Sequence, residues 1–363
     1  MNFCYRFPVV KGIQAGRTYF IAMVPLKMLS RLFPNDEEYV LPENRAQRKL
    51  NESRIPDIKN YILENRATYV FSALAASIDG DYKFISGEQS DTGILEVSMD
   101  AHFLINDGQH RKAAILAAVE EEPELGDETI SVVFFEDLGL RRSQQMFTDL
   151  NKHAVKTSNS IAELYDSRDL LAVVTRKIVS TVPFLDEYVD KEKDILGKFS
   201  SSLFTLNNFY TANKRILKRN ECNADFEQYG INFWAGVSMH MIPWNDMKSH
   251  SISKMELREK YIAAQAVVIQ AFGRVGGYLY EFRDKYNLQI TLSLIENIDW
   301  KRNAKDWKLR VIKANGRMIN SERAIILAAN VIKEKLGLPL TEDENEVENE
   351  FKMNCSQVSG HDY

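Results

Sequence analysis

The sequence predicts an α+β domain over residues 1–165, a mainly helical domain over residues 166–340 and an acidic flexible tail over residues 341–363. Strand-like and helix-like stretches alternate in the first part, whereas residues 168–337 show helical periodicity almost throughout. The last 23 residues hold seven acids and one base, which is typical of a solvated end. We therefore expect two folded parts followed by a short charged segment.

Runs of β-branched and aromatic residues predict strands, and apolar residues at helical spacing predict helices. The predicted strands cover residues 3–13, 18–24, 69–75, 82–85, 94–105 and 129–135. The predicted helices of the first part cover residues 45–65, 108–121, 141–150 and 160–165.

The second part contains clear signals for one helix and two motifs that need interpretation. Ser321 and Gly337 predict the start and the stop of a helix over residues 322–336. Gly273, Gly276 and Gly277 do not follow a strand, so a dinucleotide-binding loop is rejected. Trp300 and Trp307, seven residues apart, are expected in the core rather than in a base-stacking platform.

Composition excludes several classes of protein. Hydrophobic residues make up 45 % and charged residues 27 %, which is ordinary for a globular chain and excludes wholesale disorder. The net charge of −5 falls on the acidic end, because residues 1–340 hold 45 bases and 44 acids. Three cysteines and six scattered histidines form no disulfide framework and no metal-ligand pattern. Without a signal-peptide pattern or an apolar span, we expect a cytoplasmic protein with no membrane contact.

One strand-to-helix junction has the features of an anion site. An apolar strand runs through Asn106 and Asp107 into Gly108, and a helix that is apolar for seven residues follows. This arrangement aims backbone N–H groups and a positive dipole end at an anion, and His110 and Arg111 add side-chain donors. Two structural alternatives stay open, namely Asp107 as a helix N-cap and Arg111 as an ion-pair partner.

Two segments carry an excess of positive charge. Residues 196–220 hold five bases and no acid, and residues 296–335 hold ten bases and five acids. Such asymmetry suits contacts with DNA phosphates, although solvated helix faces look the same in sequence. The residues selected as DNA-binding candidates are Lys198, Lys214, Arg215, Lys218, Arg219, Lys301, Arg302, Lys305, Lys308 and Arg310.

The junction Asn106-Asp107-Gly108-Gln109-His110-Arg111 resembles the signature of the DGQHR-domain family, and in particular its DNA sulfur modification (phosphorothioation) members. The resemblance extends over residues 1–340 through residues 10–14, 45–48, 147–152, 196–205 and 336–340. It implies a ParB/sulfiredoxin-like first domain, in which a Gly-x-x-Arg turn holds nucleotide phosphates. Sulfiredoxins have a reactive cysteine where this chain has Gln109, so no sulfinic reductase activity is expected.

The resemblance implies a DNA-binding transcriptional repressor of a phosphorothioation gene cluster, whose partners are promoter DNA and other proteins of that system. Its phosphate or nucleotide site would comprise Arg48, Asn106, Gly108, Gln109, His110, Arg111 and Asn151. An alternative is an ATPase that uses ATP with Mg²⁺ and acts through Asp107, His110 and Arg111. A second alternative is a non-enzymatic assembly partner, and a homo-oligomer is left open.

Overall fold

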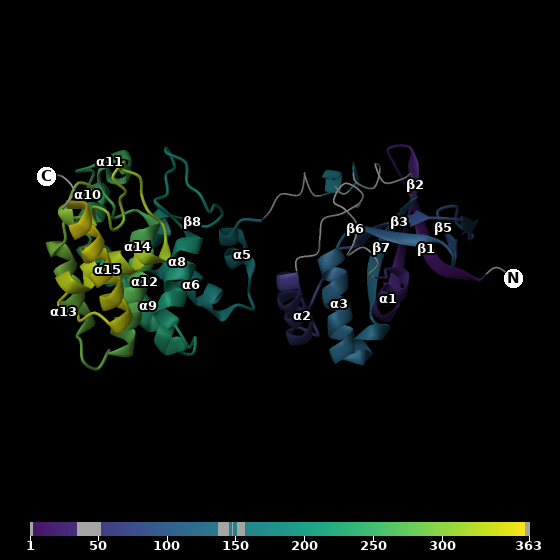
Figure 1. Cartoon of the computed structure of the whole chain (residues 1–363), viewed down its shortest axis with the longest axis horizontal. Helices are drawn as coiled ribbons and strands as arrows, with labels where there is room; N and C mark the ends of the chain where they lie inside the picture. Colours follow the sequence, from purple (N-terminus) through teal and green to yellow (C-terminus); the bar gives the residue numbers. More distant parts are fainter. Residues whose placement is uncertain (1–2, 35–51, 137–144, 147, 151–156, 360–363) are drawn as a thin grey trace. The chain divides into compact units, whose positions relative to one another are not determined.

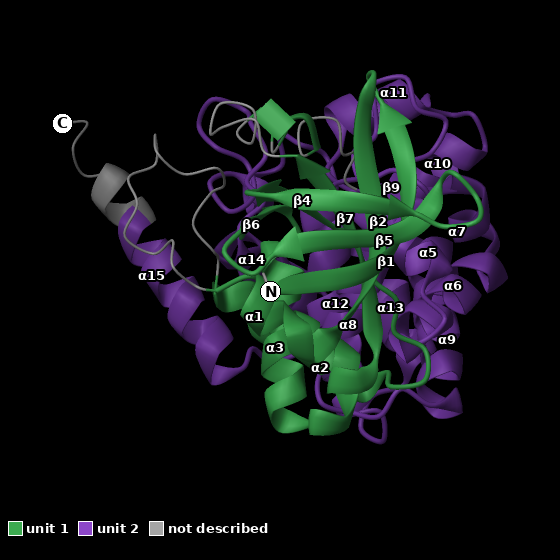
Figure 2. Ribbon diagram, turned by 90° about the vertical axis from the view of Figure 1, so that its right-hand side faces the viewer, with its two compact units in different colours: residues 1–155 green, residues 156–363 purple. Residues whose placement is uncertain are grey.

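The chain divides into two compact units, Met1–Val155 and Lys156–Tyr363 (Figure 2). The computed structural model describes residues 3–34, 52–136, 145–146, 148–150 and 157–359. The first unit is built on a sheet and the second on helices (Figure 1), which confirms the predicted α+β class. The division falls about ten residues before the predicted boundary at residue 165.

Unit 1 is organised around a seven-stranded sheet in the order β4-β5-β1-β2-β7-β3-β6. Only the β3–β7 pair is parallel, and the other neighbours are antiparallel. The strands are β1 (Cys4–Gln14), β2 (Arg17–Pro25), β3 (Leu74–Asp79), β4 (Tyr82–Ser86), β5 (Thr92–Ser98), β6 (His102–Asp107) and β7 (Thr129–Glu136). Helices α1 (Leu29–Leu32), α2 (Ile55–Glu64) and α3 (Gln109–Glu121) accompany the sheet, together with short 3₁₀ turns at Leu26–Met28 and Pro123–Asp127.

Buried and exposed residues alternate along the strands of this sheet, so one face of the sheet is apolar. Phe7, Phe20, Val24 and Phe134 point to one face and pack in a single core with Ile115 of α3. This is the period of two that a half-buried antiparallel strand requires. The sheet and the helix therefore bury their apolar faces against each other.

Two predicted strands differ from the structure. The stretch 94–105 is two strands, because a turn in which the Ala101 N–H donates to the Ser98 carbonyl separates β5 from β6. The strand predicted over 69–75 is β3, which begins at Leu74. The helix predicted over 45–65 is described from residue 52, where a 3₁₀ turn (Glu52–Arg54) leads into α2. Of the helix predicted over 141–150, residues 145–146 and 148–150 are described and are helical, and the other half lies outside the described residues.

Unit 2 is a helical domain with one short parallel strand pair, β8 (Val189–Asp190) and β9 (Phe204–Thr205). Its first helices are α5 (Asn159–Tyr165), α6 (Leu170–Thr181), α7 (Pro183–Tyr188), α8 (Leu206–Leu217), α9 (Ala224–His240) and α10 (Ile242–Lys248). They are followed by α11 (Lys254–Lys260), α12 (Ala266–Glu281), α13 (Leu288–Ser293), α14 (Glu322–Lys335) and α15 (Glu342–Ser359).

The glycines rejected as a dinucleotide loop bring α8 and α12 into close contact. A Cβ at Gly273 would lie 2.6 Å from the Ala212 carbonyl oxygen, and one at Gly277 would lie 2.8 Å from that of Arg215. The Gln270 amide adds a 2.9 Å hydrogen bond to the Asn208 carbonyl. The glycines are needed because the two backbones approach too closely for a larger residue.

The two tryptophans are core residues, as expected. Trp300 and Trp307 are 2 % and 0 % exposed, and their rings stack with centroids 5.4 Å apart. The Trp307 indole N–H donates to the Asp299 carbonyl at 2.6 Å. The helix predicted over 322–336 is also present as α14, with Ser321 as its N-cap and Gly337 at φ +68° after its end.

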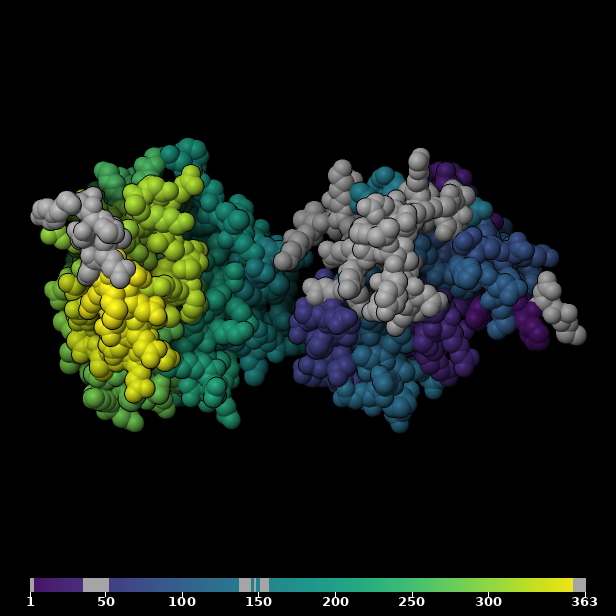
Figure 3. All heavy atoms as spheres, in the orientation of Figure 1, coloured from purple at the N-terminus to yellow at the C-terminus, as the bar shows by residue number. Residues whose placement is uncertain are grey.

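The segment expected to be a flexible acidic tail is different in the structure. Most of it forms α15, which lies against unit 2 (Figure 3). Glu344 and Glu348 are only 2 % and 6 % exposed, because they project from one face of α15 onto α14 and residue 310. The buried acidic side chains of this segment therefore attach α15 to the rest of unit 2, and the exposed ones contact solvent.

A buried ion network holds α15 in place. The Lys333 ammonium donates to the Glu344 carboxylate at 2.6 Å, and Arg274 approaches the same carboxylate at 3.2 Å. Burial lowers the pKa of Lys333. Burial alone would raise the pKa of Glu344, but hydrogen bonds from Lys333 and the Thr341 N–H hold it below its usual range. Both groups are therefore expected to be charged in the folded state.

Across the described residues, no helix is both long and apolar enough to cross a membrane.

We predict that Glu344→Ala destabilises unit 2 by about 3–5 kcal/mol, because it leaves Lys333 buried without its main partner. Glu346→Ala on the exposed face of the same helix is the control and should change stability by less than about 0.5 kcal/mol. Urea denaturation at pH 7 measures both. Equal effects of the two substitutions would contradict the role of the buried pair.

The pH dependence follows from the direction of the shift. A carboxyl whose pKa is lowered by folding contributes stability above its unfolded value, close to 4.5, and loses it as pH falls through the folded value. Glu344→Ala should therefore show its largest deficit near neutral pH and a smaller one at acid pH.

Candidate functional site

The DGQHR turn joins β6 to α3 through Gly108. Gly108 has φ +102°, a left-handed conformation that favours glycine. A Cβ at this position would also collide with the Leu74 side chain at the start of β3. Both the conformation and the close approach therefore require glycine, which explains the residue at this junction.

Arg111 clamps this turn to the backbone that immediately precedes β3. Its Nη1 donates to the Ser72 carbonyl at 2.7 Å, the Ser72 hydroxyl at 2.6 Å and the Ala73 carbonyl at 2.8 Å. Its Nη2 donates to the Asp107 carboxylate at 2.6 Å. The structure thus supports the ion-pair alternative for Arg111. Asp107 is the partner of Arg111, whereas the N-cap of α3 is Gly108.

The first turn of α3 keeps some features of an anion site. Within the described residues, no side chain caps α3, and Gln109 and His110 are half-buried there. Lys112 is 7 % exposed, and burial lowers its pKa. A helix start without a side-chain cap presents a positive dipole end to a ligand.

Asn106 supports the turn from inside. It is fully buried, and its Nδ2 donates to the Ser77 hydroxyl of β3 at 2.6 Å. Its Oδ1 has no hydrogen-bond partner among the described residues. The predicted site members Arg48 and Asn151 lie outside the described residues. Asn106, Gly108, Gln109, His110 and Arg111 lie together at one junction, but ligand binding there stays a prediction.

The first basic segment contains bases that already have acidic partners. Arg215 makes two hydrogen bonds to Glu322, at 2.7 and 2.6 Å, and is only 24 % exposed. Lys218 pairs with Glu281 at 2.8 Å, and Lys198 pairs with Glu259 at 3.0 Å. Arg215 is therefore chiefly structural, because it ties α8 to the start of α14.

Lys214 and Arg219 are the remaining candidates of this segment. Both are exposed, and neither forms an ion pair with a described residue. They can meet a phosphate without first giving up a carboxylate.

The second basic segment divides in the same way. The Arg310 guanidinium forms a bidentate ion pair with the Glu348 carboxylate of α15, with hydrogen bonds of 2.6 and 2.7 Å. Its Cζ lies 4.3 Å from the centroid of the Phe351 ring. The side chains of the pair are 14 % and 8 % exposed. Arg302 is half-buried, and its backbone N–H donates to the Lys260 carbonyl at 2.7 Å. Arg310 is therefore poorly placed to hold DNA, and Arg302 is less accessible than the exposed lysines of this segment.

Five cations of residues 301–317 are exposed and form no ion pair with a described residue. They are Lys301, Lys305, Lys308, Lys313 and Arg317. The single acid in this segment, Asp306, pairs with Lys335 at 3.4 Å. Lys313 and Arg317 belong to the basic stretch but were not among the selected candidates. Sequence reasoning missed them because charge content alone does not distinguish paired from unpaired bases.

Metal binding finds no support from the described side chains. No group of three or more His, Cys, Asp and Glu residues among them could hold a metal ion.

A family model described as DndB, DNA-sulfur modification-associated, matches residues 7–339. No curated protein and no solved structure matches the chain. The family match covers both the DGQHR turn and the basic segments of unit 2.

We predict that Arg111→Ala destabilises unit 1 by about 2–3 kcal/mol, because it removes charged hydrogen bonds to residues 72, 73 and 107. Hydrogen exchange of β3 and β6 should accelerate. Lys59→Ala, which removes a pair with Glu121 in the same unit, should cost less than about 1 kcal/mol. Wild-type exchange in the Arg111 variant would contradict the clamp.

Binding of ATP with Mg²⁺ at this turn stays a prediction that calorimetry can check. If Arg111 also holds phosphate, the folded fraction of Arg111→Ala should bind roughly ten- to hundredfold more weakly. Flat wild-type titrations with several nucleoside triphosphates and Mg²⁺ would remove the nucleotide site.

Proposed function

Since the chain belongs to the DndB family of DNA-sulfur modification-associated proteins, we propose that it binds double-stranded DNA upstream of its own gene cluster and represses transcription there. Involvement in DNA sulfur modification follows from the family. Association with other proteins of the system is part of the same proposal. The DNA-binding role needs support from the residues themselves.

The observation that carries the proposal is the exposed basic segment 301–317. Its five unpaired cations stand on a unit in which Arg215 and Arg310 are neutralised by carboxylates. An unpaired exposed lysine exchanges only counterions and water for a phosphate, so it gains from counterion release without breaking an ion pair within the protein. Lys301, Lys305 and Lys308 thus take precedence over Arg302 and Arg310 as phosphate ligands.

The charge of the whole chain does not oppose this role. Of the acids in residues 342–350, Glu344, Glu348 and Glu350 face bases of unit 2. The opposite charges of an ion pair largely cancel, so such a pair adds little to the electrostatic potential at a bound duplex. At physiological salt, screening weakens what remains beyond about 8 Å. The local excess of exposed cations therefore decides where DNA is attracted.

Repression requires only that the protein occupy the promoter. A protein bound across this region excludes RNA polymerase without any chemical step. The proposal therefore needs no catalytic residue. It predicts preference for the upstream region of the cluster over unrelated DNA of equal length.

We predict that Lys301→Ala/Lys305→Ala/Lys308→Ala weakens binding to this DNA. It should flatten the slope of log K against log salt by up to about 0.9 for each phosphate that the variant no longer neutralises. The charge-matched control replaces exposed lysines elsewhere in unit 2, namely Lys177, Lys248 and Lys285. Fluorescence anisotropy over a salt series measures both variants.

Lys214→Ala/Arg219→Ala tests the first basic segment separately.

Equal slopes for the wild type, the triple variant and the control would remove residues 301–308 from the interface. Absence of wild-type binding at low salt would overturn the DNA-binding proposal itself.

A further inference from the structure

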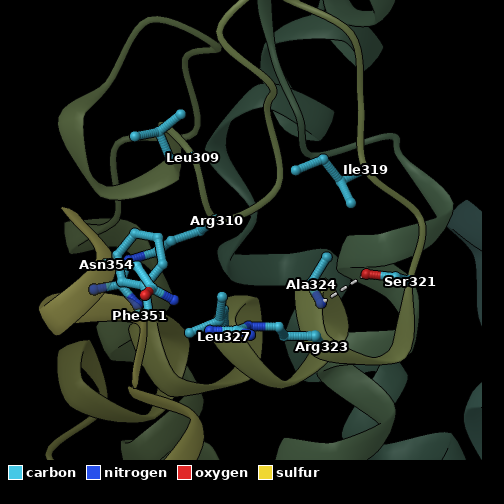
Figure 4. Close-up of a pocket in the computed structure, with 9 residues that line it drawn as sticks. All are labelled: Leu309, Arg310, Ile319, Ser321, Arg323, Ala324, Leu327, Phe351 and Asn354. Atoms are coloured by element: carbon cyan, nitrogen blue, oxygen red, sulfur yellow. Dashed lines mark hydrogen bonds between the residues drawn. The ribbon is translucent and has the colours of Figure 1, made fainter. Parts of the chain in front are cut away.

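A cavity of about 260 Å³ lies in unit 2 between residues 309–321, α14 and α15 (Figure 4). Most of its lining is apolar, and a few polar side chains border it. The lining residues are Leu309, Arg310, Ile319, Ser321, Arg323, Ala324, Leu327, Phe351 and Asn354. An apolar lining with few polar groups is typical of a small-molecule site.

The side chains form two facing walls. Leu309 and Ile319 lie on the loop side of the cavity, and Leu327 and Arg323 lie on the α14 side (Figure 4). Phe351 and Asn354 of α15 close one end. Opposed aliphatic walls beside an aromatic ring suit a flat ring system, and the Asn354 amide can both donate and accept a hydrogen bond at its edge.

Size limits the ligand. Sites for drug-sized ligands span roughly 300–1,000 Å³. This cavity, at about 260 Å³, lies just below that range. One nucleobase with its sugar at the mouth is compatible with it, whereas a dinucleotide or a long acyl chain is not.

One basic side chain of the lining, Arg323, is accessible to an anionic group. Arg310 is fully engaged with Glu348, so its charge is compensated. Arg323 is 47 % exposed and reaches Glu350, itself 65 % exposed, at 3.4 Å. Exposed pairs of this kind contribute about 0–1 kcal/mol, so a phosphate can replace the carboxylate at little cost. The exposed cations Lys308 and Lys313 belong to the same loop segment.

We propose that this cavity binds a nucleotide, with the base between the walls and the phosphate at Arg323. The same chemistry has two sources, a free nucleoside monophosphate or an unpaired nucleotide in a DNA strand. The inference goes beyond the proposed function, because a free nucleotide can bind here even if duplex DNA is not bound elsewhere. It also gives α15 a role in recognition, since Phe351 and Asn354 form part of the wall.

The test uses the full-length protein and the monophosphate of 2-aminopurine deoxyriboside as a fluorescent probe. Wild type should change the fluorescence of the probe, and unlabelled deoxynucleoside monophosphates should compete. Asn354→Trp fills the end of the cavity and should weaken binding by about tenfold or more. The matched control is Met353→Trp, an exposed neighbour on α15 that does not line the cavity.

Arg323→Gln separates the phosphate from the base. It should weaken binding of the nucleotide by up to about fivefold and leave binding of the corresponding nucleoside unchanged. Thermal melting of each variant verifies folding.

A second arm distinguishes the two sources of nucleotide. A duplex with one unpaired 2-aminopurine should show increased emission on binding if the base leaves the stack, and a fully paired duplex should not. A response to the free nucleotide alone assigns the cavity to a soluble ligand, and a response to the unpaired base alone assigns it to DNA. No response in either arm, or equal binding by Asn354→Trp and Met353→Trp, would overturn the inference. Because the paired duplex also reports DNA affinity, failure here is distinguishable from failure of the proposed function.

Discussion

The pairing of carboxylates in α15 with bases elsewhere in unit 2 is the interaction on which the distribution of exposed charge in this unit depends. Glu344 compensates Lys333 and Arg274, and Glu348 compensates Arg310. Bases engaged in these pairs are less available to phosphate, whereas the lysines of residues 301–313 are among the exposed cations that form no ion pair with a described residue. The same helix positions Phe351 against Arg310 and so completes a wall of the cavity. The pairs of α15 therefore affect both the exposed charge of unit 2 and the lining of the cavity.

In unit 1, a second clamp has a comparable effect on the DGQHR turn. Arg111 is bound to the backbone before β3 and to Asp107, so the residues that resemble a phosphate site first of all hold two strands and a helix together. A structural role does not exclude a ligand at the start of α3, which has no side-chain cap among the described residues. It does mean that weaker binding on mutation of Arg111 must be separated from unfolding.

Much of the fold could be predicted because local signals decide it. The turn at Gly108, which has φ +102°, was predicted from a strand-to-helix junction, and Ser321 was predicted as the start signal of a helix. The acidic helix was missed because its run of charges resembles a solvated segment. Its burial depends on Lys333, Arg274 and Arg310, which lie 11, 70 and 38 residues from the carboxylates that they meet. The spacing of Glu344, Val347, Glu348 and Phe351 on one helix face was the available signal. Arg215 and Arg310 were selected as DNA-binding candidates for the same reason, because only tertiary contacts show whether a basic side chain is already paired.

The central claim is that buried and half-buried bases compensated by carboxylates are structural and that the exposed, unpaired lysines contact DNA. Lysine acylation of the full-length protein, followed by mass spectrometry with and without saturating upstream DNA, tests it most directly. We expect Lys301, Lys305 and Lys308 to be labelled in the free protein and protected by DNA. Lys333, at 1 % exposed, should resist labelling in both states. Unchanged labelling of the three exposed lysines at saturating DNA would contradict the account.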